Sequence, residues 1–307
     1  MTTAELARRA DVSSPADILA LAADAGRVRT ARLGAQPALC SLVSIRSGAC
    51  PEDCRYCAQS AHWAADPPTW PMASADVITE RAQALEPAGA SHVCLVASGR
   101  GPDADDLATV CEAAGRIRRA TAMRVCACLG LLSRDQAVRL RDAGVVRVNH
   151  NLESSSRFYP FICTTHGWEE RYDTAQAVKQ AGLELCSGGI LGLGESDADR
   201  LALLLALRDL DPEVVPINVL NPRPGTPLAD AVPPTPLEAV KWLALARLAL
   251  PGAAIKLAGG RESGLRTLQG LALLAGANGL IIGGYLTTGG RPVTEDRALL
   301  RDCGFRA

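Results

Sequence analysis

Short apolar segments alternate with amphipathic stretches along most of this 307-residue chain, and this alternation constrains the fold more than any other feature. From Leu39 onward the apolar segments recur about every 25 to 45 residues, which is typical of repeated strand–helix units. The expected strands are residues 40–45, 92–97, 124–129, 145–149, 183–187, 214–220, 254–258 and 280–283. The expected helices are residues 75–88, 104–120, 133–143, 169–181, 198–210, 236–250 and 266–275. This pattern predicts an α/β fold, a (β/α)8 barrel of the TIM type.

A doubly wound sheet is the alternative fold, and the sequence disfavours it. Such a sheet would need fewer strands and a phosphate-binding glycine turn near its start, which is absent from the sequence. The glycine-rich residues 188–195 follow the fifth expected strand, but residue 197, where the last glycine of G-x-G-x-x-G would stand, is aspartate. We interpret residues 188–195 as a tight turn between a strand and a helix.

The residues before the first expected strand predict a helical extension. Ser14 can cap a helix, Pro15 suits its first turn, Asp17 favours its positive end, and Gly34 can end it. We therefore expect an N-terminal helical extension over residues 1–37 and a barrel domain over residues 38–307.

Composition narrows the classes of partner. Lysine and arginine number 32 against 33 acidic residues, so the net charge of -1 gives no reason to expect nucleic acid or an anionic membrane. A small molecule is the expected partner. No segment reaches the roughly 18 apolar residues of a membrane span, and no leader is evident, so we expect a cytoplasmic protein. In that reducing compartment, eleven cysteines indicate metal chemistry rather than disulfides.

Three cysteines lie within eight residues of the loop that follows the first expected strand. They are Cys50, Cys54 and Cys57. A loop in that position stands at the carboxyl end of the barrel, where active sites occur. A structural zinc site normally needs four protein ligands, and no fourth ligand lies nearby. A cubane iron–sulfur cluster held by three cysteines would keep one iron open to an outside ligand.

Further cysteines lie on the expected strands, at Cys94, Cys126, Cys128 and Cys186. Because side chains alternate along a strand, Cys126 and Cys128 must point to the same side. Each cysteine alone could be a small buried hydrophobic residue. Together they could converge on the barrel interior and hold a second cluster. We assign the remaining cysteines, Cys40, Cys111, Cys163 and Cys303, to packing or the surface.

Polar side chains end the fourth expected strand. By alternation Asn149, Asn151 and Glu153 share a face, whereas His150 lies on the opposite face as a packing residue. Two amides and a carboxylate at the catalytic end offer donors and acceptors for a polar ligand.

The spacing C-x3-C-x2-C, with Tyr56 before the last cysteine, resembles the signature of radical S-adenosylmethionine (SAM) enzymes. Residues 48–60 more narrowly resemble the biotin synthase family. The resemblance includes residues 164–171, 185–195 and 283–289, and extends from about Leu42 to Phe305.

The resemblance implies two iron–sulfur clusters. The loop cysteines would hold a 4Fe-4S cluster that binds SAM. An auxiliary 2Fe-2S cluster would be held by Cys94, Cys126, Cys186 and Arg261, of which Cys186 and Arg261 are the candidate catalytic residues, with Cys128 a further candidate ligand. An arginine is a poor metal ligand because it keeps its proton, so the reading that Arg261 is a charge paired with a carboxylate or with cluster sulfide stays open.

The resemblance also implies the binding residues. Tyr56 would lie beside the adenine of SAM, Arg171 would hold its carboxylate, and Asn151 and Glu153 would contact it. The substrate dethiobiotin would contact Asn149 and Asn218. Two residues depart from the family pattern: Glu153 stands where many members have aspartate, and Cys128 is an extra thiol beside a presumed ligand.

The implied reaction is sulfur insertion. Cleavage of SAM gives a 5′-deoxyadenosyl radical that removes hydrogen from dethiobiotin, and sulfur from the auxiliary cluster completes biotin. An electron donor such as flavodoxin or ferredoxin and a homodimer are implied as well. The alternatives are a related radical SAM enzyme, which would lack the strand cysteines; lipoyl synthase, which carries an N-terminal cysteine motif that residues 1–39 lack; and a non-catalytic zinc- or iron-binding barrel.

Overall fold

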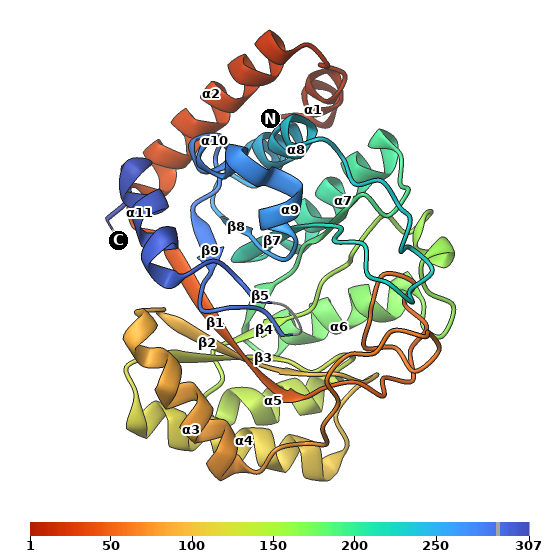
Figure 1. The fold of residues 1–307 in the computed structure, drawn as a ribbon, viewed down its shortest axis with the longest axis vertical. Coiled ribbons are helices and arrows are strands. Elements are labelled where there is room, and N and C mark those ends of the chain that lie inside the picture. The colour runs from red at the N-terminus through yellow and green to blue at the C-terminus, as the bar shows by residue number, and fades with distance from the viewer. Residues whose placement is uncertain (287–288, 307) are drawn as a thin grey trace.

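A closed parallel β-barrel forms the centre of the computed structural model, which describes residues 1–286 and 289–306 (Figure 1). The strands of the described chain are β1 (Ala38–Arg46), β2 (His92–Ala97), β3 (Arg124–Cys128), β4 (Arg147–Asn149), β5 (Glu184–Cys186), β6 (Gly189–Leu191), β7 (Val214–Val219), β8 (Ala254–Leu257) and β9 (Gly279–Ile281). Their order is β5-β4-β3-β2-β1-β9-β8-β7-β6, and a further pairing of β5 with β7 closes the barrel. The predicted (β/α)8 fold is confirmed.

The fifth expected strand is divided in two. β5 ends at Cys186 and β6 begins at Gly189, so the prediction that residues 188–195 are only a turn is wrong for their first part. The two glycines allow this arrangement, because a Cβ on Gly188 would lie 1.9 Å from the carbonyl oxygen of Pro216, and one on Gly189 would lie 2.6 Å from that of Glu153. Backbone therefore approaches backbone on both sides of this strand.

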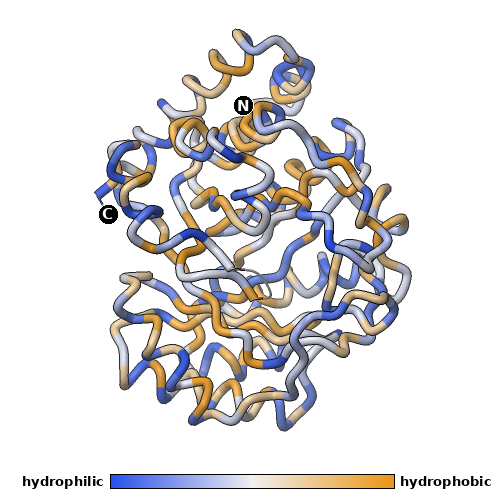
Figure 2. The backbone as a smooth tube through the Cα atoms, viewed as in Figure 1, coloured by the Kyte–Doolittle hydropathy of each residue, from blue (hydrophilic) through white to orange (hydrophobic). Residues whose placement is uncertain are grey.

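Helices surround the barrel and bury its outer face. They are α3 (Ala75–Leu85), α4 (Ala104–Ala120), α5 (Arg134–Asp142), α6 (Trp168–Gln180), α7 (Asp197–Leu210), α8 (Pro236–Ala249), α9 (Arg261–Leu265), α10 (Gln269–Leu274) and α11 (Val293–Asp302), with 3-10 turns at Glu86–Ala88, Tyr159–Phe161 and Arg266–Leu268. Figure 2 shows hydrophobic residues along the strands and on the helix faces that pack against them. The sequence did not predict α9 or α11.

The N-terminal segment forms two helices, α1 (Thr3–Ala10) and α2 (Pro15–Leu33). The capping of α2 is as expected, because the Ser14 hydroxyl accepts a hydrogen bond from the amide of Asp17 at 3.1 Å. The helix ends at Gly34, whose φ of 65° lies in the left-handed region. Because β1 begins at Ala38, we propose that the extension ends at residue 37, as the sequence indicates.

The extension covers a helix that would otherwise expose apolar surface. All residues of α8 from Ala239 to Ala249 are buried, since one side of α8 packs on the barrel and α2 lies along another (Figure 1). A helix that is buried on every side requires such cover. The ammonium group of Lys241 on α8 ties the extension down by a 3.0 Å hydrogen bond to the carbonyl oxygen of Ala10. Within the described residues, we find no helix with both the length and the apolar character of a membrane span.

We expect Gly188→Ala to lower the free energy of unfolding by about 1–3 kcal/mol, the usual cost of forcing atoms into a packed core. The added methyl group would push β5 and β6 away from β7. Guanidinium unfolding followed by circular dichroism measures the change. The matched control is Gly252→Ala, where no described atom lies within 4 Å of the added Cβ, and where we expect a change within about 0.5 kcal/mol. Equal losses in the two variants would contradict the packing explanation.

Candidate active site

The loop that carries the three clustered cysteines, residues 47–60, is folded back on itself. It follows β1, and the amide of Cys50 donates to the carbonyl oxygen of Gln59 at 2.9 Å while the amide of Cys57 donates to that of Cys54 at 3.0 Å. The indole of Trp63 donates to the same Cys54 carbonyl at 3.0 Å. Backbone hydrogen bonds within the loop and the Trp63 indole thus stabilise its conformation, and Cys57 lies at the edge of the barrel cavity.

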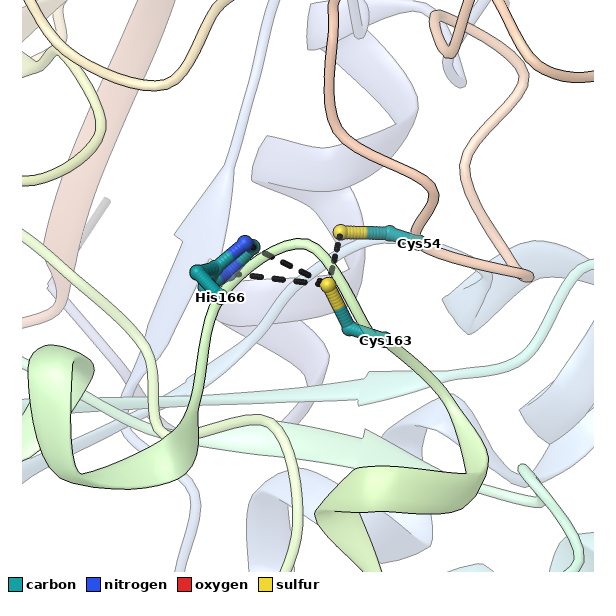
Figure 3. A group of neighbouring side chains, drawn as sticks. All are labelled: Cys54, Cys163 and His166. Carbon is teal, nitrogen blue, oxygen red and sulfur yellow. Dashed lines mark hydrogen bonds between the residues drawn. The ribbon is translucent and has the colours of Figure 1, made fainter.

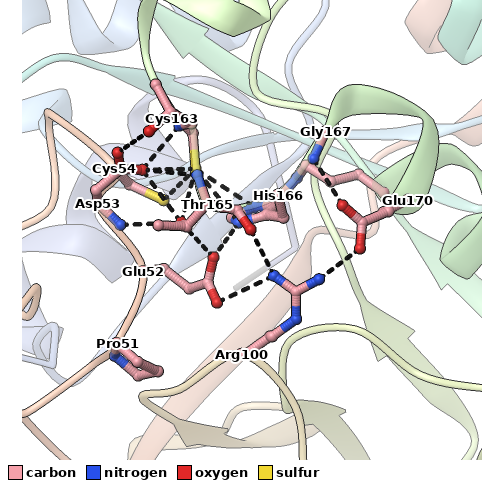
Figure 4. A network of polar contacts seen from close by, with 12 residues as sticks. Pro51, Glu52, Asp53, Cys54, Arg100, Cys163, Thr165, His166, Gly167 and Glu170 are labelled. Carbon is pink, nitrogen blue, oxygen red and sulfur yellow. Dashed lines mark hydrogen bonds and ion pairs between the residues drawn. The ribbon is translucent and has the colours of Figure 1, made fainter.

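Two acidic residues between the first two loop cysteines anchor the loop to the segment before α6 (Figure 4). The Asp53 carboxylate accepts hydrogen bonds from the amides of Thr164, at 2.8 Å, and Thr165, at 3.2 Å. Burial alone would raise the pKa of Asp53, but hydrogen bonds from the Thr164 hydroxyl and from these two amides outweigh it and hold the pKa well below its usual range. The neighbouring Glu52 contacts the hydroxyl of Thr165 at 2.5 Å and the ring of His166.

Arg100 joins this network from the loop after β2 (Figure 4). Its guanidinium contacts Glu52 at 3.3 Å, the carbonyl oxygen of Thr165 at 2.7 Å and the carboxylate of Glu170 at 2.5 Å. The cysteine loop is thus held by side chains from two other βα loops. The spacing of the cysteines in sequence gave no sign of these contacts.

Cys54 points toward a thiol and an imidazole that the sequence analysis did not assign to the site (Figure 3). Its sulfur lies 3.7 Å from that of Cys163, which lies 3.3 Å from Nδ1 of His166. The hydrogen bond from Cys54 lowers the pKa of Cys163 to about 4 against the effect of burial. Cys163, expected to be a packing or surface residue, is buried against a loop cysteine.

The loop thiols fit a metal cluster. Burial raises the pKa of Cys50 and raises that of Cys57 to about 11, so without a metal these groups are neutral thiols at pH 7. Bound iron would stabilise the thiolates, since a coordinating thiol loses its proton. All three thiols come from one folded loop, and the side chain of Cys57 faces a cavity in which an outside ligand could reach the metal.

A cavity of about 370 Å³ occupies the barrel interior below this loop. Its walls include the four strand cysteines that the sequence singled out, Cys94, Cys126, Cys128 and Cys186, so Cys126 and Cys128 do face the same side. Cys40 on β1 lines the same cavity. The assignment of Cys40 to packing missed this position, although the alternation rule, applied to β1, could have found it.

Two buried cations line the cavity among these thiols, Arg147 on β4 and Lys256 on β8. Arg147 forms an ion pair with Glu184, which also accepts a 2.9 Å hydrogen bond from Arg124. Burial would raise the pKa of Glu184, but the two arginines outweigh it and lower the pKa below 4.5. Neither cation was predicted from the sequence, although a charged residue in an apolar strand was a usable signal.

Arg261 lies elsewhere, which corrects the expected placement of this residue. It is the first residue of α9 and is not among the cavity-lining residues. Its guanidinium is bound by Asp296 at 2.7 Å, Gln269 at 2.5 Å and the hydroxyl of Tyr285 at 3.0 Å. Tyr285 stands between Arg261 and the cavity that it lines. These contacts agree with the alternative interpretation, in which Arg261 is a charge paired with a carboxylate.

The expected substrate amides line the cavity. Asn149 lies between two thiols, accepting from Cys128 at 3.3 Å and donating to the sulfur of Cys186 at 3.2 Å. Asn218 is held at both ends of its amide, because it donates to the carbonyl oxygen of Gly189 at 3.2 Å and accepts from the amide of Gly259 at 2.8 Å. Both side chains are therefore fixed in orientation.

The expected SAM residues gather beside the cysteine loop. Tyr56 and Asn151 line the cavity, whereas Glu153 and Arg171 lie behind them. Arg171 donates to the carbonyl oxygen of Asn151 at 2.6 Å and lies 3.3 Å from the carboxylate of Glu153. Burial raises the pKa of Glu153 despite Arg171, and its Oε2 has no hydrogen-bond partner among the described residues. The predicted packing role of His150 agrees with its burial outside the cavity wall.

The class of protein follows from the fold, the loop and a family comparison. The model of the radical SAM superfamily matches residues 44–207, more than half of the chain, and that of the Biotin and Thiamin Synthesis associated domain matches residues 216–306. This is a radical SAM barrel. Its curated relatives include biotin synthases of Picosynechococcus sp., 45% identical over 100% of this chain and 85% of the relative, and of Geobacter sulfurreducens, 46% identical over 94% and 88%. The chain belongs to the biotin synthase family.

Solved structures confirm the fold. Methylornithine synthase has a TM-score of 0.85 at 19% identity, covering 99% of this chain and 93% of that chain. The FeFe-hydrogenase maturase HydG from Carboxydothermus hydrogenoformans has a TM-score of 0.86 at 18% identity, covering 99% and 75%. At these identities the likeness concerns the barrel alone.

The sequence resemblance also included residues 283–289. Positions 287 and 288 of that motif lie outside the described residues.

We expect Glu184→Gln to lower the free energy of unfolding at pH 7 by about 1–3 kcal/mol, because it removes charge-assisted hydrogen bonds to two arginines. The pKa of Glu184 is lower in the folded chain than in the unfolded chain, so its contribution is complete above pH 4.5 and is lost as the pH falls. The difference between variant and wild type should therefore shrink below pH 4.5 in unfolding curves. Asp142→Asn, at an exposed ion pair with Arg141, is the control, expected to cost at most about 1 kcal/mol. A pH-independent difference for Glu184→Gln would contradict the ion-pair explanation.

Proposed function

We propose that this chain is a biotin synthase that converts dethiobiotin to biotin. Membership of the family supports the proposal, together with one observation on the structure: a loop of three cysteines stands directly above a cavity lined by further cysteines. The three-cysteine loop is explained by radical SAM chemistry, which needs a cluster with one open iron. The strand cysteines account for sulfur insertion, which a radical SAM enzyme without them would lack.

In this proposal Cys50, Cys54 and Cys57 hold a 4Fe-4S cluster and Cys94, Cys126 and Cys186 take part in holding an auxiliary cluster. When bound, the first supplies the electron that cleaves SAM, and the second supplies sulfur. The protein provides placement. The cavity lies between the two sets of thiols, and in this proposal it holds the substrate there.

The SAM site in this proposal is the group Tyr56, Asn151, Glu153 and Arg171. The orphaned Oε2 of Glu153 is a buried acceptor, which suits the hydroxyl donors of a ribose. Glu153 also has a φ of 64°, a left-handed conformation that is unusual for a residue with a side chain and often marks a functional site. Arg171 steadies this carboxylate and would bind the carboxylate of SAM.

The substrate site in this proposal lies on the cavity walls between the two clusters. Asn149 and Asn218 present amides there, and a ureido ring offers matching donors and acceptors. Their fixed orientations favour a single pose. Because Asn149 also contacts the sulfur of Cys186, a substrate bound to it would lie next to the proposed sulfur source.

Several features stay predictions from the resemblance. They are a flavodoxin or ferredoxin as electron donor and a homodimer; a cytoplasmic location likewise stays a prediction, made from the sequence itself. One observation favours the alternative of a non-catalytic barrel that binds a single zinc or iron ion. Ligand atoms of Cys54, Cys163 and His166 all lie within 4.8 Å of one another. Metal analysis separates it from the proposed function: zinc without iron and sulfide would indicate the single-ion site.

We expect the wild-type chain, reconstituted anaerobically and given SAM, dethiobiotin and reduced flavodoxin, to form 5′-deoxyadenosine and biotin. Cys54→Ala should lose both products, because SAM would no longer be cleaved. Cys186→Ala should still form 5′-deoxyadenosine, while biotin falls by about 100-fold or more, exceeding the usual cost of losing a residue that only supports a ligand. Chromatography with mass spectrometry measures both products.

The matched control is Cys111→Ala, because this half-buried cysteine lies on α4 outside the cavity. It should form both products as the wild type does. Biotin at normal yield from Cys186→Ala would contradict the sulfur-donor assignment. A colourless wild-type protein that binds zinc in place of iron would overturn the proposed function.

A further inference from the structure

Cys40 belongs to the same wall as the strand cysteines. In the register of the sheet, Cys94 pairs with Cys126 and with Leu42, and Cys40 is two residues before Leu42 on the same face of β1. Cys40, Cys94 and Cys126 are buried in contact with one another as a separate cluster of the core. A fourth thiol therefore lies beside those that the family resemblance assigns to the auxiliary cluster.

The spacing of the barrel cysteines suits a multi-atom cluster. Among the described residues, the one group of metal-binding side chains with all ligand atoms within 4.8 Å of one another is Cys54, Cys163 and His166, outside the barrel wall. Sulfurs around a single zinc ion would lie closer than this, about 3.8 Å apart, given Zn–S bonds of about 2.3 Å. No three sulfurs of the barrel cysteines in the described chain all lie within 4.8 Å of one another, which favours a cluster of iron and sulfide over a single ion.

Buried positive charge in the same place calls for an anion. Lys256 is 5% exposed and lines the cavity. It lies among the thiols of Cys40, Cys126 and Cys186, and the lysine ion pairs found among the described residues belong to Lys179 and Lys241, not to Lys256. Arg147, beside the same thiols, has its Nε buried without a partner among the described residues. A buried lysine without a carboxylate partner is costly unless an anion is present.

The arginine expected to complete the ligand set is already engaged. Arg261 forms an ion pair with Asp296, and its exposed fraction is 1%. Turning it toward the strand cysteines would leave the buried Asp296 carboxylate unpaired and displace Tyr285. Breaking a buried pair in this way is strongly destabilising, because it leaves an uncompensated buried charge. Cys128 is only partly buried and lies two residues beyond Cys126 on β3, outside the buried group of Cys40, Cys94 and Cys126.

We propose that Cys40 is the fourth ligand of the auxiliary cluster, so that four thiolates, from Cys40, Cys94, Cys126 and Cys186, hold it without an arginine ligand. This inference rests on the proposed function for the presence of that cluster. Four thiolates are a complete ligand set for an iron–sulfur cluster. They carry more negative charge than three, and Lys256 and Arg147 balance it inside the barrel.

The test uses a variant in which Cys50, Cys54 and Cys57 are all replaced by alanine, so that bound iron and sulfide report the barrel cluster alone. After anaerobic reconstitution, this background should hold iron and sulfide and show a cluster absorption and Mössbauer spectrum. Addition of Cys40→Ala should lower iron and sulfide by about 10-fold or more. Addition of Cys40→Ser should change the Mössbauer spectrum, because oxygen would replace sulfur on one iron.

Two control variants in the same background separate a ligand from a packing residue. Cys111→Ala should leave iron, sulfide and spectra unchanged. Arg261→Lys keeps the charge beside Asp296 and should also leave the spectra unchanged, whereas loss of an arginine ligand would alter them. Circular dichroism shows whether each variant is folded, and the conservative Cys40→Ser decides the result if Cys40→Ala is not.

The proposal is overturned if both Cys40 variants keep the background iron content and spectrum, or if the background variant binds no cluster. It is also overturned if Arg261→Lys, and not Cys40→Ser, changes the spectrum. These measurements read no product. Biotin formation by the wild type tests the proposed function separately, so the failure of one is distinguishable from the failure of the other.

Discussion

Closure of the barrel between β5 and β7 is the constraint on which the rest of the site depends. It brings Cys186 to the wall opposite β1, so that cysteines distant in sequence face one interior. Closure requires close backbone contact, which Gly188 and Gly189 permit. At the same two glycines the strand is interrupted between β5 and β6. The interruption places the backbone of β6 against Glu153 in the candidate SAM site. One pair of glycines thus serves both the fold and the site.

Two regularities of the strands account for most of what the sequence could predict: their spacing along the chain and the alternation of side chains within each strand. Parallel strands buried on both faces read as continuous apolar segments, and their spacing gave the barrel directly. Alternation then placed Cys126 and Cys128 on one side, and separated His150 from Asn149. Two-residue periodicity is a local property that needs no knowledge of tertiary contacts. For that reason the cavity face could be predicted where the strand was recognised.

The residues that were misplaced or missed have two other physical explanations. Arg261 was misplaced because β8 ends at Leu257, so that Arg261 begins α9 instead of lying beside the strand cysteines. Lys256 was missed inside a strand that the sequence did predict, where its charge was the usable signal. Element boundaries are the least certain part of sequence reasoning. Cys163 and the anchors Glu52 and Asp53 lie on irregular loops, where no period applies. Their contacts arise from how three βα loops meet above the barrel, which the sequence does not encode locally.

The distribution of charge separates the two ends of the site. Near the cysteine loop, the cation Arg171 already has the carboxylate of Glu153 beside it, and the acids Glu52 and Asp53 are satisfied by hydrogen bonds from the neighbouring loop. Deeper in the barrel, Lys256 lies among thiols, and among the described residues it has no ion pair with a carboxylate, unlike Lys179 and Lys241. Neutral thiols cannot stabilise a buried ammonium as thiolates do, since the Coulomb attraction is strong at low dielectric constant. The deep end therefore has a net positive charge that a bound anionic cluster would neutralise, and the substrate cavity lies between these two electrostatically distinct regions.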